Sequence, residues 1–309
     1  MTDTRPRASF WQRFNRMDEG RFGYLLIAPT ALLMLVFLAL PIGYSILMSL
    51  NRIELTISPD WKFIGLNNFG GLLSDNQVNA AIPRTLFFAA LNVVFTTVLA
   101  LVLSIVLNEP FKGRRWVRVF ILLPWAVAPV VSGVMWRYMF HQSYGLINAV
   151  LRALGLIDKY VVWFDDPSVA LSVAAIASAW KALPFASLIL LAAMQGIPES
   201  LYRAAKMDGA SILHRFWYVT FPHLRPTVIF VVVLQIIASL QAFDLIFTLT
   251  RGGPGQGTVV LNYLTFINAF ERLSLGSASA LALALAGLIM VLSGISLSLT
   301  VRRTPKGQA

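Results

Sequence analysis

Cysteine is absent from this chain, and charged residues are scarce. Without cysteine the protein has no disulfide framework, no thiol nucleophile and no metal site built on thiolates. Charged residues occupy 13% of the 309 positions, whereas about 25% is usual in a soluble domain. Hydrophobic residues make up 57%, and the mean hydropathy is +0.72. The composition excludes an ordinary soluble domain and predicts a protein whose solvent is lipid.

Motifs for ATP hydrolysis and for metal or nucleophilic catalysis are also missing. No Gly-x-x-x-x-Gly-Lys-Ser/Thr sequence occurs, so the chain does not bind ATP in the P-loop manner. The histidines, His141, His214 and His223, are scattered and predict no metal site. No Ser-His-Asp arrangement follows from the spacing. The sequence therefore favours a membrane protein that is not an enzyme.

Six apolar segments are long enough to cross about 30 Å of hydrocarbon, which takes about 20 helical residues. They cover approximately residues 24–50, 85–108, 119–138, 169–194, 226–249 and 273–301. Helices are expected because lipid offers no partner for backbone amides, and the alternation of barrel strands is absent. The first segment is too long for a signal peptide and lacks a clear cleavage site, which predicts an uncleaved anchor. We expect an all-α polytopic domain over 24–301, with tails at 1–23 and 302–309.

Lysine and arginine concentrate in alternate connections between these segments. The basic set is Arg5, Arg7, Arg13, Arg16, Arg21, Lys112, Arg114, Arg115, Arg118, Arg203, Lys206, Arg215, Arg225, Arg302, Arg303 and Lys306. Connections on the other side carry fewer basic residues and several acids, namely Glu54, Asp60, Asp75, Asp158, Asp165 and Asp166. Because short cytoplasmic loops are rich in Lys and Arg, both termini are predicted to be cytoplasmic. We therefore attribute the net charge of +11 to topology and not to nucleic-acid binding.

A polar, basic and helix-prone stretch, residues 199–222, lies in the loop 195–225 between the fourth and fifth segments. Pro198 opens a first short helix, Asp208-Gly209 breaks it, and apolar residues at helical spacing follow from Ile212. This pattern predicts a capped helix pair in the cytoplasm against which a partner docks. A helical loop without function is the alternative, although loops of this length are seldom without one.

The same stretch resembles the EAA loop of permeases of ABC importers. The family pattern is Glu-Ala-Ala, three residues, Gly, nine residues, Ile, one residue and Leu-Pro. Here the corresponding residues are Arg203-Ala204-Ala205, Gly209, Val219 and Phe221-Pro222. Arg203 reverses the charge of the family glutamate, and Glu199, one turn earlier, is the expected partner for it. The resemblance implies a coupling helix seated on an ATPase subunit through Arg203, Ala204, Ala205, Asp208, Gly209, Ala210 and Pro222.

Other segments resemble permeases of the sugar type, related to the maltose, glycerol-phosphate and trehalose systems. The residues that carry the likeness are Ala28-Pro29, Gly65-Leu66-Asn67-Asn68-Phe69, Leu123-Pro124, Trp180, Pro184-Phe185, Thr250-Arg251-Gly252-Gly253-Pro254, Thr258, Asn262-Tyr263 and Ala269-Phe270. Together they span approximately residues 20–300 in the expected order.

The resemblance implies a six-span permease subunit of a bacterial or archaeal inner-membrane importer. It would pair with a second permease subunit and two ATPase subunits, which bind the ATP and Mg, and receive sugar from an extracytoplasmic binding protein. No cofactor is expected on this chain. A secondary transporter or a membrane-embedded enzyme remain alternatives, but matching coupling carboxylates and a catalytic constellation are not evident in the spans.

Polar and aromatic residues in the spans are candidates for the solute pathway: Asn92, Trp180, Lys181, Gln235, Ser239, Gln241 and Asp244. Lys181 has two structural alternatives, an ion pair with Asp244 or snorkelling toward water. Asn92 has the alternative of a hydrogen bond between helices. Gln241 and Asp244 are expected on one face of the fifth span, and Gln235 with Ser239 on another. Trp136 is expected in the aromatic belt at the outer interface.

Overall fold

The computed structural model describes residues 19–301. Outside this range lie residues 1–18 and 302–309, with the basic residues expected to mark the cytoplasmic tails, Arg5, Arg7, Arg13, Arg16, Arg302, Arg303 and Lys306. The all-α polytopic expectation is confirmed. Five helices in the described range are long and apolar enough to cross a membrane, and a bent helix pair adds a sixth if it counts as one span.

In chain order the elements, with η marking π-helical turns, are α2 (Glu19–Met34), η1 (Leu35–Ala39), α3 (Leu40–Ser49), β1 (Asn51–Glu54), β2 (Ser58–Phe63), α4 (Asn67–Ser74), α5 (Asn76–Asn108), α6 (Arg114–Ile121), α7 (Leu123–Ala126), α8 (Pro129–Met139), α9 (Leu146–Ala153), α10 (Pro167–Gln195), α11 (Glu199–Met207), α12 (Ile212–Arg215), η2 (Phe216–Thr220), α13 (Phe221–Leu240), α14 (Asp244–Leu249), α15 (Leu261–Phe266), η3 (Ile267–Glu271) and α16 (Leu275–Val301).

Helices α5 and α10 form the centre of the bundle and make its most extensive helix contact among the described residues. Alanines of α10 at helical spacing, Ala170, Ala174 and Ala177, are completely buried. Small residues let two helix backbones approach closely, which matters in lipid because apolar burial there gives no driving force between helices. Asp166 caps α10 by accepting from Ser168 N at 2.7 Å and Val169 N at 3.0 Å. Hydrogen bonds from the Ser168 hydroxyl and then from these amides lower the pKa of Asp166.

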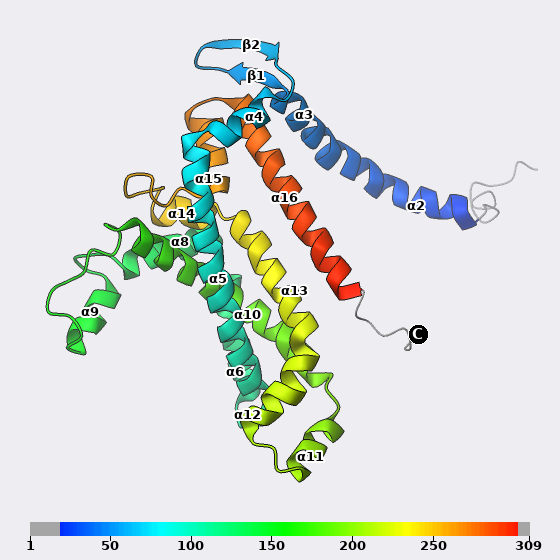
Figure 1. Cartoon of the computed structure of the whole chain (residues 1–309), viewed down its shortest axis with the longest axis vertical. Helices are drawn as coiled ribbons and strands as arrows, with labels where there is room; N and C mark the ends of the chain where they lie inside the picture. The colour runs from blue at the N-terminus through cyan, green and yellow to red at the C-terminus, as the bar shows by residue number, and fades with distance from the viewer. Residues whose placement is uncertain (1–18, 302–309) are drawn as a thin grey trace, which may run out of the picture.

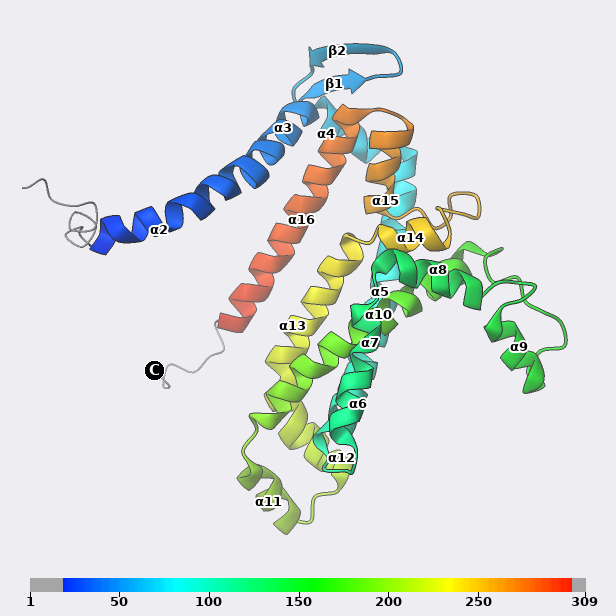
Figure 2. The same cartoon turned by 180° about the vertical axis from the view of Figure 1, so that it is seen from behind.

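The first helical segment, α2 to α3, stands away from the bundle (Figure 1, Figure 2). None of the span Leu26–Ser49 is buried along its most apolar stretch, and α3 meets the bundle through α16. An antiparallel hairpin, β1–β2, follows it and was not predicted. Asn68, from the Gly65–Phe69 segment, holds the base of the hairpin by donating to Ser49 O at 2.8 Å and Asn51 O at 2.9 Å.

The predicted third span, 119–138, is bent. Residues Arg114–Ala126 and Pro129–Met139 meet at 95°. Val127 and Ala128 between them are extended, with ψ of 131° and 141°. Pro129 causes this break, because proline disfavours the helical conformation in the residue before it. The bend turns α8 toward α14 and the side of α10.

The predicted fifth span, 226–249, also differs. Its helix is continuous from Ile212 through η2 and α13 to Leu240, then breaks before the separate helix α14. The carbonyl of Gln241, released from the helix by the break, accepts a hydrogen bond from Asn262 Nδ2 at 2.8 Å. Gln241 and Asp244 therefore do not share one face of a single helix.

Close packing joins α8 to α14. A methyl group at Gly133 would overlap the Oγ1 of Thr248. We predict that Gly133→Ala lowers the free energy of unfolding by about 1–3 kcal/mol, because a side chain added to a packed contact forces the helices apart. Gly287→Ala in α16 is the matched control, since its added methyl meets no atom within 4 Å. Thermal unfolding of the purified proteins measures the loss of stability in each variant. Equal melting temperatures for Gly133→Ala and Gly287→Ala would contradict the packing argument.

Asn92 and Ser239 form a hydrogen bond between α5 and α13, with Nδ2 to Oγ at 2.9 Å and both side chains buried. We predict a coupling free energy of about 0.6–1.7 kcal/mol in a double-mutant cycle of Asn92→Ala and Ser239→Ala, as found for hydrogen bonds between helices in lipid. Detergent unfolding of the four proteins gives the value. Strictly additive effects would show that the bond contributes nothing.

Candidate functional site

The loop predicted to couple to an ATPase projects from one end of the bundle, opposite the β1–β2 hairpin (Figure 1). Helix α11 ends at Met207, Asp208 is its C-cap, and Gly209 follows with φ of +75°. Gly209 N donates to Lys206 O at 3.1 Å and Ala210 N to Ala205 O at 2.9 Å. This pattern is that of a glycine-terminated helix, which needs the left-handed conformation that glycine adopts without strain. The predicted role of Asp208-Gly209 as a helix breaker is confirmed.

The second helix of the predicted pair begins at Ser211. Its hydroxyl accepts from His214 N at 3.3 Å and caps α12. This helix does not end within the loop but runs through η2 into α13. Pro222 lies at the start of α13, where the wider π-helical turn carries Phe221 N to Phe216 O. The second element is therefore the extension of the fifth span, so a displacement of α12 acts directly on α13.

A hydrogen bond links α11 to this extension. Tyr202 Oη and Thr220 Oγ1 are 3.0 Å apart, and Thr220 is buried. Ile197, between α10 and α11, is buried too. The loop is thus attached to both α10 and α13 at its base.

The tip of the loop exposes large apolar side chains. Met207 is 87% exposed, Ile212 77% and Leu213 71%. Ala204 of the EAA-like segment is also exposed, and Ala205 is half-buried. Because these side chains surround a turn in a polar, basic loop, their exposure makes the tip a candidate docking surface. The sequence indicated Ile212 only as the start of an apolar helical pattern, and Met207 carries no local signal of exposure.

The expected ion pair between Glu199 and Arg203 does not form. Within residues 19–301 the Arg203 side chain makes neither an ion pair nor a hydrogen bond. Its guanidinium faces solvent and is available to a partner. The reversed charge at this position is accordingly not neutralised inside the loop.

The candidate pathway residues fall into separate groups. Asn92, Ser239 and Gln235 lie together, because Ser239 joins Asn92 and also donates to Gln235 O at 2.7 Å. The alternative given for Asn92, a hydrogen bond between helices, is the one observed. Gln235 Oε1 is buried and has no partner in the described part of the chain.

Lys181 belongs to a second group. Its Nζ donates to Trp125 O at 3.3 Å, at the end of α7, and makes no ion pair with Asp244 among the described residues. Asp244 is exposed at the start of α14. The carbonyl of Trp125 is available to Lys181 because the proline-induced break after α7 interrupts the helix there.

Tryptophans pack beside this break. Trp180 meets Trp136 edge-on, with ring centroids 6.0 Å apart, and Trp136 stacks on Phe140 at 5.6 Å. Trp136 is 9% exposed and belongs to the main apolar core. The expectation that it anchors at the lipid interface is wrong, because the bend turns α8 inward against α10.

Comparisons with known proteins identify the family. The model of the family described as "Binding-protein-dependent transport system inner membrane component" matches residues 96–303. A trehalose/maltose transport system permease protein, MalF, of Thermococcus litoralis is 38% identical over 86% of this chain and 88% of its own length. A sulfoquinovosyl glycerol transport system permease protein, SmoG, of Agrobacterium fabrum is 31% identical over 93% of this chain and 92% of its own.

Solved structures agree on the fold. A bacterial ABC transporter involved in import of the acidic polysaccharide alginate superposes with a TM-score of 0.79 at 24% identity, over 95% of this chain and 99% of that one. The alternatives of a secondary transporter and a membrane enzyme are set aside by these relatives. The chain belongs to the family of binding-protein-dependent transport system inner membrane components, and it is a permease subunit of an ABC importer, whose ATPase is a separate subunit.

Proposed function

We propose that this chain forms half of a pathway for a sugar or sugar derivative, and that the loop at 199–222 docks on an ATPase subunit. A second permease subunit completes the pathway, two ATPase subunits bind ATP and Mg, and an extracytoplasmic binding protein delivers the solute. Both termini and the loop lie in the cytoplasm. The named solutes of the relatives, trehalose, maltose and sulfoquinovosyl glycerol, support a sugar-type substrate.

The single observation that carries the docking proposal is the exposed apolar tip of the loop. Met207, Ile212 and Leu213 lie around the Gly209 turn with no cover among residues 19–301. Basic residues, Arg203 and Lys206, lie in the preceding helix and keep the loop out of hydrocarbon. An apolar tip with a basic flank fits a groove on a soluble subunit with acidic residues at its rim.

Force from the ATPase reaches the bundle through two attachments. The hydrogen bond between Tyr202 and Thr220 links α11 to η2, and α12 is continuous with α13 through η2. Helix α13 ends at the group formed by Asn92, Gln235 and Ser239. When α11 moves with the ATPase, α13 shifts against α5, and the bond between Asn92 and Ser239 is the contact that this shift strains.

The solute pathway opens next to these groups. Gln235 Oε1 lacks a partner in the described range and accepts a hydrogen bond from a solute hydroxyl or water when the helices part. Lys181 reaches from α10 to the carbonyl of Trp125 near the end of α7, Gln241 follows the end of α13, and Asp244 begins α14. Their polar side chains therefore lie close to breaks in the helices. Aromatic faces at Trp180 provide the apolar surface on which sugar rings pack.

We predict that Gly209→Pro abolishes ATP-dependent uptake and co-purification of the ATPase, while insertion of the chain into the membrane is unchanged. Proline fixes φ near −65° and removes the amide that bonds Lys206 O, so the turn at φ of +75° is lost. Gly209→Asn is the matched control, because asparagine tolerates the left-handed region. Normal uptake by Gly209→Pro would refute the coupling role.

We predict that Lys181→Met lowers uptake severalfold more than it lowers the yield of assembled transporter. Methionine keeps the length of the side chain and removes the charge and the donor to Trp125 O. Lys181→Arg, which retains the charge, should keep most of the uptake. Parallel loss of uptake and yield in Lys181→Met would indicate that Lys181 has only a structural role.

A further inference from the structure

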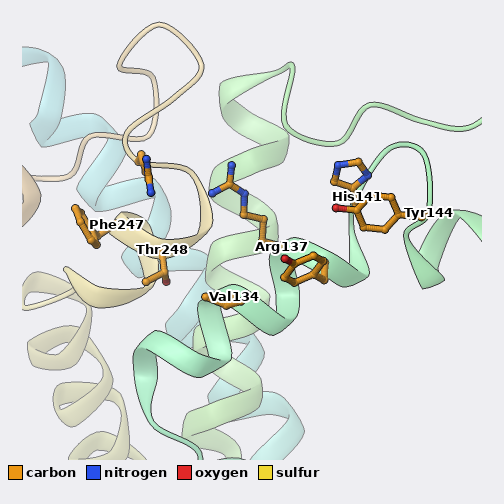
Figure 3. A pocket seen from close by; sticks show the side chains of 8 residues that line it. Val134, Arg137, His141, Tyr144, Phe247 and Thr248 are labelled. Atoms are coloured by element: carbon orange, nitrogen blue, oxygen red, sulfur yellow. The ribbon is translucent and has the colours of Figure 1, made fainter.

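A pocket of about 350 Å³ lies between α8, α14 and the loop that follows α14. Its lining residues are Val134, Arg137, Tyr138, His141, Tyr144, Phe247, Thr248 and Arg251. Figure 3 shows Arg137 between Thr248 on one side and His141 with Tyr144 on the other. The volume falls in the range of about 300–1,000 Å³ that is typical of small-molecule sites.

The pocket lies far from the loop at 199–222, which is called the coupling loop below. Gly257, in the loop that carries Arg251, packs against Pro167 at the first turn of α10. The coupling loop follows the other end of α10, about 44 Å away for 29 helical residues. With the coupling loop in the cytoplasm, the pocket faces the outside.

Two guanidinium groups line this pocket without any carboxylate. The side chains of Arg137 and Arg251 make neither ion pairs nor hydrogen bonds within residues 19–301, and no Asp or Glu lines the pocket. His141 Nδ1 accepts from Ser143 N at 3.2 Å, which leaves Nε2 as the donor of the neutral ring. Two like charges facing one cavity repel each other, so the arrangement is stabilised by an anion placed between them.

Both arginine side chains are exposed, and each is carried by a backbone segment with defined contacts. Arg251 has φ of +50°, an uncommon value for a residue with a side chain, and Arg251 N bonds Ile246 O at 3.0 Å. Thr250 and Thr258 hydroxyls, 2.7 Å apart, close the loop around it. Arg137 lies one turn beyond Gly133, where α8 touches α14 most closely. A backbone conformation of the kind seen at Arg251 is common at ligand clamps.

Aromatic rings form the remaining wall. His141 and Tyr144 are stacked with centroids 3.6 Å apart, and Phe247 packs on Phe243 at 5.5 Å. Flat rings with two guanidinium forks match a sugar ring that carries a planar or tetrahedral oxyanion, because arginine binds carboxylate and phosphate groups bidentately.

We infer that this pocket is an external binding site for an anionic sugar, with the carboxylate, sulfonate or phosphate of the solute held by Arg137 and Arg251. The inference rests on the proposed function and narrows its substrate class. The ring of the sugar lies against Tyr144 and Phe247, and His141 donates to a ring hydroxyl. Lys181 and Gln235 belong to later contacts in the bundle.

The test uses the assembled transporter without binding protein and without ATP. Equilibrium dialysis measures the affinities of the transporter for labelled glucuronate and for labelled glucose, and their ratio is compared between variants. These probes differ by a carboxylate in place of a hydroxymethyl group. We expect glucuronate to bind at least about tenfold more tightly, the effect of one charge-assisted hydrogen bond. In Arg137→Gln/Arg251→Gln the ratio should fall to about one. Arg52→Gln, which removes an exposed arginine paired with Glu54 in the hairpin, is the matched control and should keep the ratio.

Single Arg137→Lys and Arg251→Lys variants, which retain charge and lose the bidentate fork, should give intermediate ratios even if the double variant is unstable. Equal binding of the two sugars to the unaltered transporter would overturn the inference. So would an unchanged ratio in the double variant together with weaker binding of the extracytoplasmic protein, which would assign the arginines to carboxylates of that partner. Uptake of both probes is then measured with the same transporter in vesicles, after ATP and the extracytoplasmic binding protein have been added. Glucuronate preference without ATP-dependent uptake contradicts the proposed function alone, whereas uptake without the preference contradicts this inference alone.

Discussion

The close contact of α5 with α10 is the constraint on which the rest of the structure depends. Lipid supplies neither hydrogen-bond partners for the backbone nor a hydrophobic force between helices, so the bundle forms where small residues let backbones meet. Buried alanines of α10 and polar side chains of α5, among them Asn92, meet these requirements. Helix α13 packs onto this pair through the bond from Asn92 to Ser239, and α16 packs on α13. The first helix, with no buried residues in its most apolar stretch, lies outside this assembly.

Breaks in the helices leave backbone carbonyls free to accept hydrogen bonds from side chains, which the continuous helices α5 and α10 do not provide. Pro129 ends α7 early and leaves the Trp125 carbonyl to Lys181, and the break after Leu240 leaves the Gln241 carbonyl to Asn262. Backbone of this kind is tolerated at membrane depth where protein or a polar cavity satisfies it. The same bends bring α8 against α14 and create the basic pocket of Arg137 and Arg251. The loop at 199–222 and this pocket lie at opposite ends of α10, as the proposed cytoplasmic dock and the proposed external site require.

Much of this organisation could be predicted from the sequence. Hydropathy located the spans, and the spacing from Arg203 to Pro222 identified the loop, because both signals depend on local residue type. The bend at Pro129 and the early end of the fifth helix could not be predicted, since proline is also tolerated in straight membrane helices and no proline marks Gln241. The burial of Trp136 follows from that bend, and the β1–β2 hairpin is held by a distant residue, Asn68. The convergence of Arg137 and Arg251 arises only from tertiary structure, although each was visible in the sequence.

The central claim, that the loop around Gly209 docks on a cytoplasmic ATPase, is tested most directly by chemical labelling. The chain has no cysteine, so Met207→Cys introduces a unique thiol at a side chain that is 87% exposed. A membrane-impermeant maleimide should label it in inverted vesicles and not in right-side-out vesicles when the chain is expressed without its partners. Co-expression of the ATPase subunits should protect the thiol. Labelling from the outside, or equal labelling of inverted vesicles with and without the ATPase, would contradict the account.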